Sequence, residues 1–304
     1  MKNEFAGNLD AIEREYSGKI EMRSLGRTGV KLSILGFGGI VVMNASPAEA
    51  SARVRTAIDH GINYFDVAPS YGNAEVKLGP ALKPYRSDVF LACKTMERSR
   101  EGARRELEQS LSNLQTDHFD LYQFHAVTTI EEVKMIFGKN GAMETFQEAK
   151  KEGKIRLIGF SAHSVEAAMA MMDNYDFDTI LFPTNYTTWH AGNFGPQVLQ
   201  RAFEKGMGIL ALKAMARGPY AADVVEKLEK CWYQPLTDPE EALLGLRFTL
   251  SHPVTAALPP GDENLYAMAL SLIPRIKPLQ TSEINTVIRK AGSGIPLFTY
   301  PAEL

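Results

Sequence analysis

The stretch INYFDV at residues 62–67 is a short apolar run, and it is one of eight runs of this kind along the chain. Most of the eight are apolar on both faces, which is typical of strands in a parallel sheet that is covered on both sides. The other seven runs lie at residues 33–39, 88–94, 119–125, 155–161, 178–183, 208–213 and 254–259.

Helical patterns separate these runs. A helix predicted at residues 104–114 has its leucines on one face, and Ser99 is placed to cap its N-terminus. A second helix, at 142–152, is expected to end at Gly153. Alternating strands and helices in one chain favour a closed (β/α)8 TIM barrel over an open doubly wound sheet. The other predicted helices lie at residues 47–60, 165–172, 198–205 and 240–251.

No Pro-, Gly- or Ser-rich linker divides the chain, so we predict one barrel domain over residues 1–304. Residues 1–20 are expected to be an N-terminal extension, and residues 280–304 a C-terminal one. The segment EMRSLGRTGVK at 21–31 predicts a short hairpin around its glycines. Residues 218–238 form a longer insertion after the seventh run.

The charges nearly balance, because 33 Lys and Arg against 36 Asp and Glu leave a net charge of −3. No basic field therefore indicates nucleic acid or an anionic membrane as a partner. No apolar stretch is long enough to span a bilayer, and the first residues are too acidic for a secretory signal. Cys93 and Cys231 lie far apart, which excludes a disulfide scaffold and cysteine-ligated clusters. We expect a cytoplasmic monomer or homo-oligomer without a metal.

In a (β/α)8 barrel the active site lies at the carboxyl ends of the strands, so polar residues there are the candidates. Asp66 is the last residue but one of the second run and Tyr71 lies in the loop after it, while Lys94 ends the third run and His125 the fourth. Each of these residues alone is more often structural. Four ionisable groups at three successive strand ends indicate a catalytic site.

The four side chains suit one reaction. Lys94 and Asp66 are expected to pair, because either charge alone is costly to bury. An ammonium near the Tyr71 hydroxyl favours the phenolate and is expected to lower the tyrosine pKa, which suits a general acid near neutral pH. His125 is placed to donate a hydrogen bond to a carbonyl oxygen. The group therefore suits protonation of the alkoxide that forms when a hydride reaches a carbonyl carbon.

The segments around these residues resemble the aldo-keto reductase family. GINYFDVAPSYG at residues 61–72 is similar to the family signature, and RRELEQSLSNLQTDHFDLYQFH at 104–125 resembles the segment that leads to the family histidine. MRSLGRTGVKLSILGFGG at 22–39 looks like the N-terminal hairpin, which plugs the N-terminal end of the barrel, and the first strand. KKEGKIRLIGFS at 150–161 resembles the fifth-strand signature.

The resemblance implies an NAD(P)-dependent oxidoreductase that moves a hydride between nicotinamide and the carbonyl or alcohol of a small substrate. Aromatic and polar residues in the predicted loops suit a sugar-like or another small carbonyl substrate. It implies that Tyr71 is the general acid or base, and that His125 orients the carbonyl. Lys94 would tune the tyrosine, and Asp66 would pair with Lys94. Neither a metal nor a flavin takes part in this chemistry.

The expected nicotinamide contacts depart from the family pattern. Ser161 stands where the family binds the carboxamide, but Ala162 replaces the usual Asn, so His163 is a candidate for the second hydrogen bond. Asn185 is the amide nearest to the usual Gln of the sixth strand. Leu212 replaces the tyrosine that stacks on nicotinamide and offers no π-stacking.

The expected phosphate and adenosine contacts lie later in the chain. Lys213 offers a point charge to the pyrophosphate. In the segment LPPGDENL at 258–265, Asp262 is suited to a ribose 2′-hydroxyl and would repel a 2′-phosphate. We therefore expect NAD or NADP, with NAD favoured unless Lys213 or the insertion supplies a cation. The remaining cofactor candidates are Gly38, Gly39, Arg217, Gly218, Gly261 and Asn264.

Substrate contacts are expected from Trp189, His190 and Trp232, although packing is the more common role of a tryptophan. The apolar tail at 294–304 is expected to dock, either over the barrel mouth or against a neighbouring subunit. Two other functions stay open on the sequence. One is a sugar epimerase or lyase that uses tightly bound NAD(P) transiently, and the other is a non-enzymatic cofactor-binding regulatory subunit.

Overall fold

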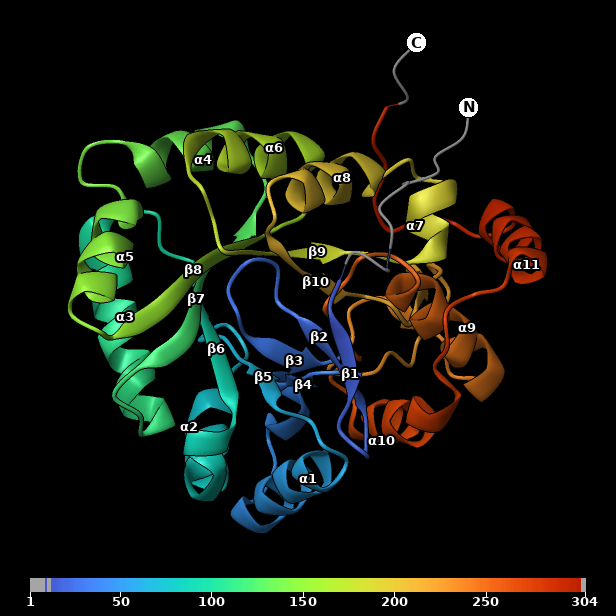
Figure 1. The fold of residues 1–304 in the computed structure, drawn as a ribbon, viewed down its shortest axis with the longest axis horizontal. Coiled ribbons are helices and arrows are strands. Elements are labelled where there is room, and N and C mark those ends of the chain that lie inside the picture. The colour runs from blue at the N-terminus through green and yellow to red at the C-terminus, as the bar shows by residue number, and fades with distance from the viewer. Residues whose placement is uncertain (1–8, 10–11, 302–304) are drawn as a thin grey trace. The chain divides into compact units, whose positions relative to one another are not determined.

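Eight parallel strands form one sheet, in the order β4-β5-β6-β7-β8-β9-β10-β13, in a computed structural model that describes residues 9 and 12–301 (Figure 1). Each of the eight predicted runs overlaps one of these strands, and β6, β7 and β8 extend one or two residues past their runs. The strands are β4 (Phe37–Gly38), β5 (Tyr64–Asp66), β6 (Phe90–Thr95), β7 (Phe119–Val127), β8 (Ile155–Ala162), β9 (Thr179–Pro183), β10 (Gly208–Leu212) and β13 (Ala256–Leu258).

Helices separate the strands along the chain, and the six predicted helices are confirmed with small shifts of their ends. The α-helices are α1 (Pro47–Asp59), α2 (Ala74–Leu82), α3 (Arg100–Leu114), α4 (Ile130–Phe137), α5 (Ala142–Lys151), α6 (Val165–Asn174), α7 (Tyr186–His190), α8 (Pro196–Glu204), α9 (Pro239–Leu250), α10 (Glu263–Leu272) and α11 (Thr281–Gly292). Three short 3-10 helices are η2 (Gly39–Val42), η3 (Lys83–Asp88) and η4 (Ile273–Arg275). Within the described residues, no helix combines the length and apolar character that crossing a bilayer requires.

Local capping chemistry explains several helix ends. The side chain of Ser99 accepts a hydrogen bond from the backbone N–H of Gly102 and so begins α3 as predicted. Gly153, with a φ of 76°, follows α5 in the left-handed conformation that glycine tolerates. Helix α4, which was not predicted, begins with a capping box between Thr129 and Glu132.

By its contacts the chain divides into two units: a central unit, residues 36–181, and a terminal unit, residues 1–35 with 182–304. The organisation as one domain over residues 1–304 stays a prediction. In the central unit, β5, β6 and β7 are neighbours, with Asp66 paired to Ala92 and Lys94 paired to Gln123. Their carboxyl ends therefore bring three of the four candidate catalytic residues to one edge of the sheet.

In the terminal unit, the predicted hairpin is confirmed as β2 (Glu21–Ser24) and β3 (Lys31–Ser33), and β1 (Arg14–Tyr16) adds a third antiparallel strand. Arg23 is 1% exposed and donates hydrogen bonds to the carbonyl oxygens of Leu250 and Val254. The turn at Gly26 packs so closely on the backbone of residues 206–208 that a Cβ there would lie 2.3 Å from an atom of Gly208. The hairpin thus lies at the amino ends of β10 and β13.

The insertion and the tail belong to the terminal unit. Residues 218–238 contain little regular structure beyond β12 (Gln234–Pro235), which pairs with β11 (Ala216–Gly218). The tail is docked within this unit, because Phe298 stacks on Phe194 and the N–H of Tyr300 donates to the carbonyl of Gly192. Docking is thereby confirmed for the tail as far as residue 301; residues 302–304 lie outside the described part.

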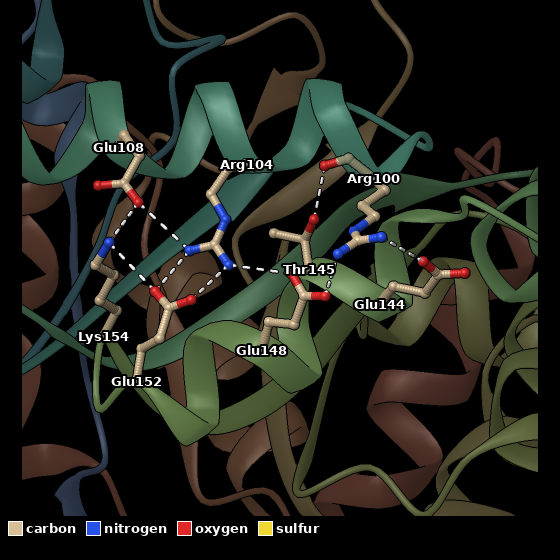
Figure 2. Close-up of polar contacts among 8 residues, drawn as sticks. All are labelled: Arg100, Arg104, Glu108, Glu144, Thr145, Glu148, Glu152 and Lys154. Carbon is tan, nitrogen blue, oxygen red and sulfur yellow. Dashed lines mark hydrogen bonds and ion pairs between the residues drawn. The ribbon is translucent and has the colours of Figure 1, made fainter.

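An ion network joins α3 to α5 (Figure 2). Arg104 donates to both carboxylate oxygens of Glu152, at 2.7 and 2.9 Å, and also lies 3.3 Å from Glu148. Arg100 pairs with Glu144 and Glu148, and Lys154 pairs with Glu108 and Glu152. A bidentate arginine within a network contributes more to stability than an isolated surface pair does.

We expect Arg104→Met to lower the midpoint of thermal unfolding by roughly 2–4 °C at low ionic strength, and by less in about 1 M NaCl, where salt screens the network. Arg105→Met is the matched control, because Arg105 is on the same helix and makes one exposed pair with Glu101 at 3.6 Å. The measurement is circular dichroism melting of both variants at two salt concentrations. If both variants lower the unfolding midpoint equally, the network contributes no more to stability than the isolated pair does.

Candidate active site

The carboxylate of Asp66 on β5 and the ammonium of Lys94 on β6 form an ion pair, and both side chains are buried. The predicted pairing is confirmed. Oδ2 of Asp66 also accepts hydrogen bonds from the hydroxyl of Tyr64 and from Nε2 of Gln123, each at 3.0 Å. The buried negative charge is thus met by one cation and two neutral donors, as a charge in an apolar interior requires.

Lys94 joins this pair to Tyr71. Its Nζ lies 3.3 Å from the Tyr71 hydroxyl, to which it donates. Burial alone would lower the pKa of Lys94, but the attraction of Asp66 and Tyr71 outweighs burial and raises it. Lys94 therefore stays protonated around neutral pH and presents a positive charge to the tyrosine oxygen.

The pKa of Tyr71 is raised, and the expectation of a lowered value is wrong for the chain as described. Burial raises the pKa of the phenol, Lys94 lowers it as expected, and Asp66 raises it again. Burial is the largest of these effects. The phenol therefore carries its proton at neutral pH, which is the state that a proton donor needs.

His125 on β7 faces Tyr71, with the two ring centroids 5.7 Å apart and the planes nearly perpendicular. Its Nδ1 lies 3.3 Å from the hydroxyl oxygen of Ser70 in the loop that carries Tyr71. Both rings are half-buried, whereas Asp66 and Lys94 are fully buried. The structure thus brings the four predicted residues together in the central unit, with the tyrosine and histidine at the accessible side.

Four predicted cofactor residues lie in this unit. Ser161, at the end of β8, is buried and its Oγ accepts a hydrogen bond from the N–H of Ala126, the residue after His125. The N–H of His163 donates to the carbonyl of Val127 at 3.1 Å. Gly39 packs against Val67, where a Cβ would lie 2.6 Å from a methyl group, but a Cβ on Gly38 would meet no atom within 4 Å.

In the terminal unit, Asn185 caps α7, and its Oδ1 accepts from the N–H of Thr188 at 2.9 Å. Its Nδ2 is buried and meets no hydrogen-bond acceptor among the described residues. Leu212 is half-buried at the end of β10. Arg217 forms an ion pair with Glu241, which also pairs with Lys290 at 2.9 Å.

Lys213 is buried beneath aromatic rings from the insertion and the tail. Its Nζ lies 5.0 Å from the ring centre of Trp232, 5.9 Å from that of Tyr233 and 5.7 Å from that of Phe298. Its φ of 67° is unusual for a residue other than glycine. Burial lowers the pKa of Lys213 to about 7. A direct contact with pyrophosphate stays a prediction, and it requires the rings to share the lysine with that group.

Two acidic residues after β13, Asp262 and Glu263, make contacts within the chain. Asp262 caps α10, and its Oδ1 accepts from the N–H groups of Asn264 and Leu265, each at 3.0 Å. Lys230 of the insertion forms an ion pair with Glu263 at 3.0 Å. The insertion therefore places a cation beside this segment, which sequence reasoning left open. Gly218 and Gly261 are buried and Asn264 is exposed.

The three predicted substrate residues have different environments. Trp189 is 1% exposed and stacks on His252 at 4.3 Å between ring centres, so its surroundings are those of a packing residue. His190 is half-buried, and burial lowers its pKa. Trp232 is 62% exposed and has the most surface to offer a ligand. Contact of any of the three with a substrate stays a prediction.

Tyr64 and Gln123 are the residues that sequence reasoning missed in this site. A period-two pattern was the available signal, because Tyr64 precedes Asp66 by two residues on β5, and Gln123 precedes His125 by two on β7. Alternate residues of a strand share a face, so a polar residue two positions from a catalytic one is a candidate for the same site.

Known proteins resemble this chain in sequence and in fold. The sequence model of the Aldo/keto reductase family matches residues 35–239. L-galactose dehydrogenase of Arabidopsis thaliana is 30% identical over 216 residues, which cover 66% of this chain and 67% of that protein.

Two solved structures share the fold. Aldo-keto reductase AKR11C1 from Bacillus halodurans, in its holo form, superposes with a TM-score of 0.70 at 22% identity, over 92% of this chain and 97% of that one. An aldo-keto reductase from Klebsiella pneumoniae in complex with NADPH gives a TM-score of 0.69 at 20% identity, with the same coverage. The predicted (β/α)8 class is confirmed. The chain belongs to the aldo/keto reductase family and is an NAD(P)-dependent oxidoreductase of its type.

Proposed function

We propose that the chain transfers a hydride between a nicotinamide cofactor and the carbonyl or alcohol carbon of a small, sugar-like substrate, with Tyr71 as the proton donor or acceptor. The observation that carries the proposal is the position of the Tyr71 hydroxyl. The residue is half-buried, and the hydroxyl lies 3.3 Å from Nζ of Lys94, which is itself paired with Asp66. A relative named L-galactose dehydrogenase supports a sugar as the substrate class.

The residues present fit a nicotinamide cofactor. A Cβ on Gly38 would meet no atom within 4 Å, so the backbone there is open to a ligand. The Ser161 oxygen accepts from Ala126 and keeps a hydroxyl proton to donate. When bound, the cofactor supplies or accepts the hydride, and the chain supplies position and proton.

Tyr71 would give its proton to the substrate oxygen as negative charge develops there, and Lys94 stabilises the phenolate that remains. Asp66 cannot compete for that proton as a base, because its oxygens already accept from Lys94, Tyr64 and Gln123. His125 would hold the same substrate oxygen through a ring N–H. Oxidation of an alcohol runs through the same groups in reverse.

The Tyr71→Phe variant tests the proton transfer. We expect it to lower kcat for reduction of an aldose or oxidation of L-galactose at least about 100-fold, the usual contribution of a general acid, with cofactor affinity unchanged. Tyr175→Phe is the matched control, since Tyr175 is a half-buried tyrosine of the same unit that neighbours Phe177. Retention of kcat by Tyr71→Phe would remove Tyr71 from the reaction.

The raised pKa of Tyr71 sets the pH dependence. Reduction needs the protonated phenol, so its kcat should stay level through neutral pH and fall only above about pH 10, the usual tyrosine value. Oxidation needs the phenolate and should rise with pH over the same range. The measurement is kcat in both directions against pH at saturating cofactor. A loss of reduction centred near neutral pH would show that another group donates the proton.

Cofactor preference follows from the charges after β13. We propose that NADH is favoured and that Lys230, paired with Glu263, limits this preference by offering a cation to a 2′-phosphate. Lys230→Met should weaken NADPH binding roughly tenfold, about 1.4 kcal/mol, and leave NADH binding within twofold. Fluorescence titration gives both dissociation constants, with Lys227→Met as the control. Tighter binding of NADPH than NADH to the unmodified chain would overturn the preference.

A further inference from the structure

A buried arginine joins the ends of the two strands that carry Lys94 and His125. Arg98 lies beyond β6 and is 7% exposed. Its Nη1 donates to the carbonyl oxygen of Thr95, next to Lys94, at 3.3 Å. Its Nη2 donates to the carbonyl oxygen of His125 itself at 2.6 Å. One planar, rigid cation thus contacts the backbone beside both catalytic side chains.

Glu132 holds this arginine in place. Its Oε1 accepts from Nε and Nη2 of Arg98, at 3.1 and 2.9 Å, and its Oε2 accepts from the N–H groups of Thr128 and Thr129. Burial raises the pKa of Glu132, but the hydrogen bonds from Thr128 and the charge of Arg98 outweigh burial, so the pKa is lowered. Glu132 therefore stays ionised and ties Arg98 to the chain that follows His125.

The backbone at His125 needs such support. Pairing between β7 and β8 is irregular between Phe124 and Val127, and Ala126 has a φ of 52°. A left-handed alanine is strained and persists only where its surroundings hold it. The N–H of Ala126 donates to Ser161, and the carbonyl of His125 accepts from Arg98. The irregular strand end is therefore fixed by side chains rather than by the sheet.

We propose that Arg98, held by Glu132, is a positioning residue that directs the His125 imidazole towards Tyr71. The effect of Arg98 on catalysis rests on the proposed function. Its effect on the position of the His125 side chain does not. Arg98 does not reach the reacting atoms. It acts by fixing the peptide plane on which the histidine side chain depends.

Arg23 provides a matched control. It is 1% exposed, pairs with Glu21 at 2.8 Å, and donates to the carbonyl oxygens of Leu250 and Val254 at 2.9 and 2.8 Å. None of these residues carries a candidate catalytic side chain. Arg23→Met and Arg98→Met therefore remove the same kind of buried arginine, but only the second removes the contact with His125.

A double-mutant cycle gives the kinetic test. We expect Arg98→Met to lower kcat about 10- to 100-fold while the NADH dissociation constant stays within twofold, and Arg98→Lys to recover part of the loss. In a His125→Gln background, Arg98→Met should lower kcat by less than about threefold further. The proposal is overturned if the two losses simply multiply, or if Arg98→Met and Arg23→Met lower kcat equally.

A second readout needs no activity. The chain has six histidines, and the His125 signal in a spectrum of chain labelled with nitrogen-15 at histidine is the one that His125→Gln removes. We expect Arg98→Met, or Arg98→Lys if the first variant does not fold, to shift this signal, and Arg23→Met to leave it in place. An unmoved signal overturns the proposal. If the unmodified chain turns over no carbonyl or alcohol, the proposed function fails while this readout still decides the role of Arg98.

Discussion

The buried ion pair of Asp66 and Lys94 is the constraint on which the centre of the chain depends. Removing either partner would leave an uncompensated charge in an apolar interior, at a cost of several kcal/mol. The pair also specifies the strand register. Asp66 lies opposite Ala92, so Lys94 is two residues farther along β6 on the same face and reaches back to the carboxylate. A slip of one residue would turn the lysine to the other face.

This ion pair also determines how charge acts on Tyr71. Lys94 Nζ contacts both the Asp66 carboxylate and the Tyr71 hydroxyl, so its charge also acts on the tyrosine oxygen. Burial then opposes that charge and keeps the phenol protonated. The site stores a proton next to a cation, which suits an acid that must become an anion during turnover and regain its proton afterwards.

The sequence predicted this half of the molecule well, because strand ends and residue chemistry suffice to locate the four ionisable groups. It predicted the direction of the Tyr71 pKa wrongly, since burial is a property of the packed structure and no single residue type reveals it. Helix α4 was missed, although its capping box of Thr129 and Glu132 is written in the sequence. The cofactor residues of the terminal unit were harder, because their environments depend on segments distant in sequence.

Those distant segments explain why residue type alone is a poor guide there. Lys213 looked like a phosphate ligand, but its neighbours are the rings of Trp232, Tyr233 and Phe298, from the insertion and the tail. Asp262 looked like a ribose ligand, but its carboxylate also caps a helix. The positions of catalytic groups are constrained by the geometry of one reaction. Loops after the strands vary more, so the contacts of their residues are harder to predict. Candidate catalytic residues at strand ends can therefore be predicted from one sequence. Ligand contacts made by loops can be assigned only when the structure shows how the loops pack against one another.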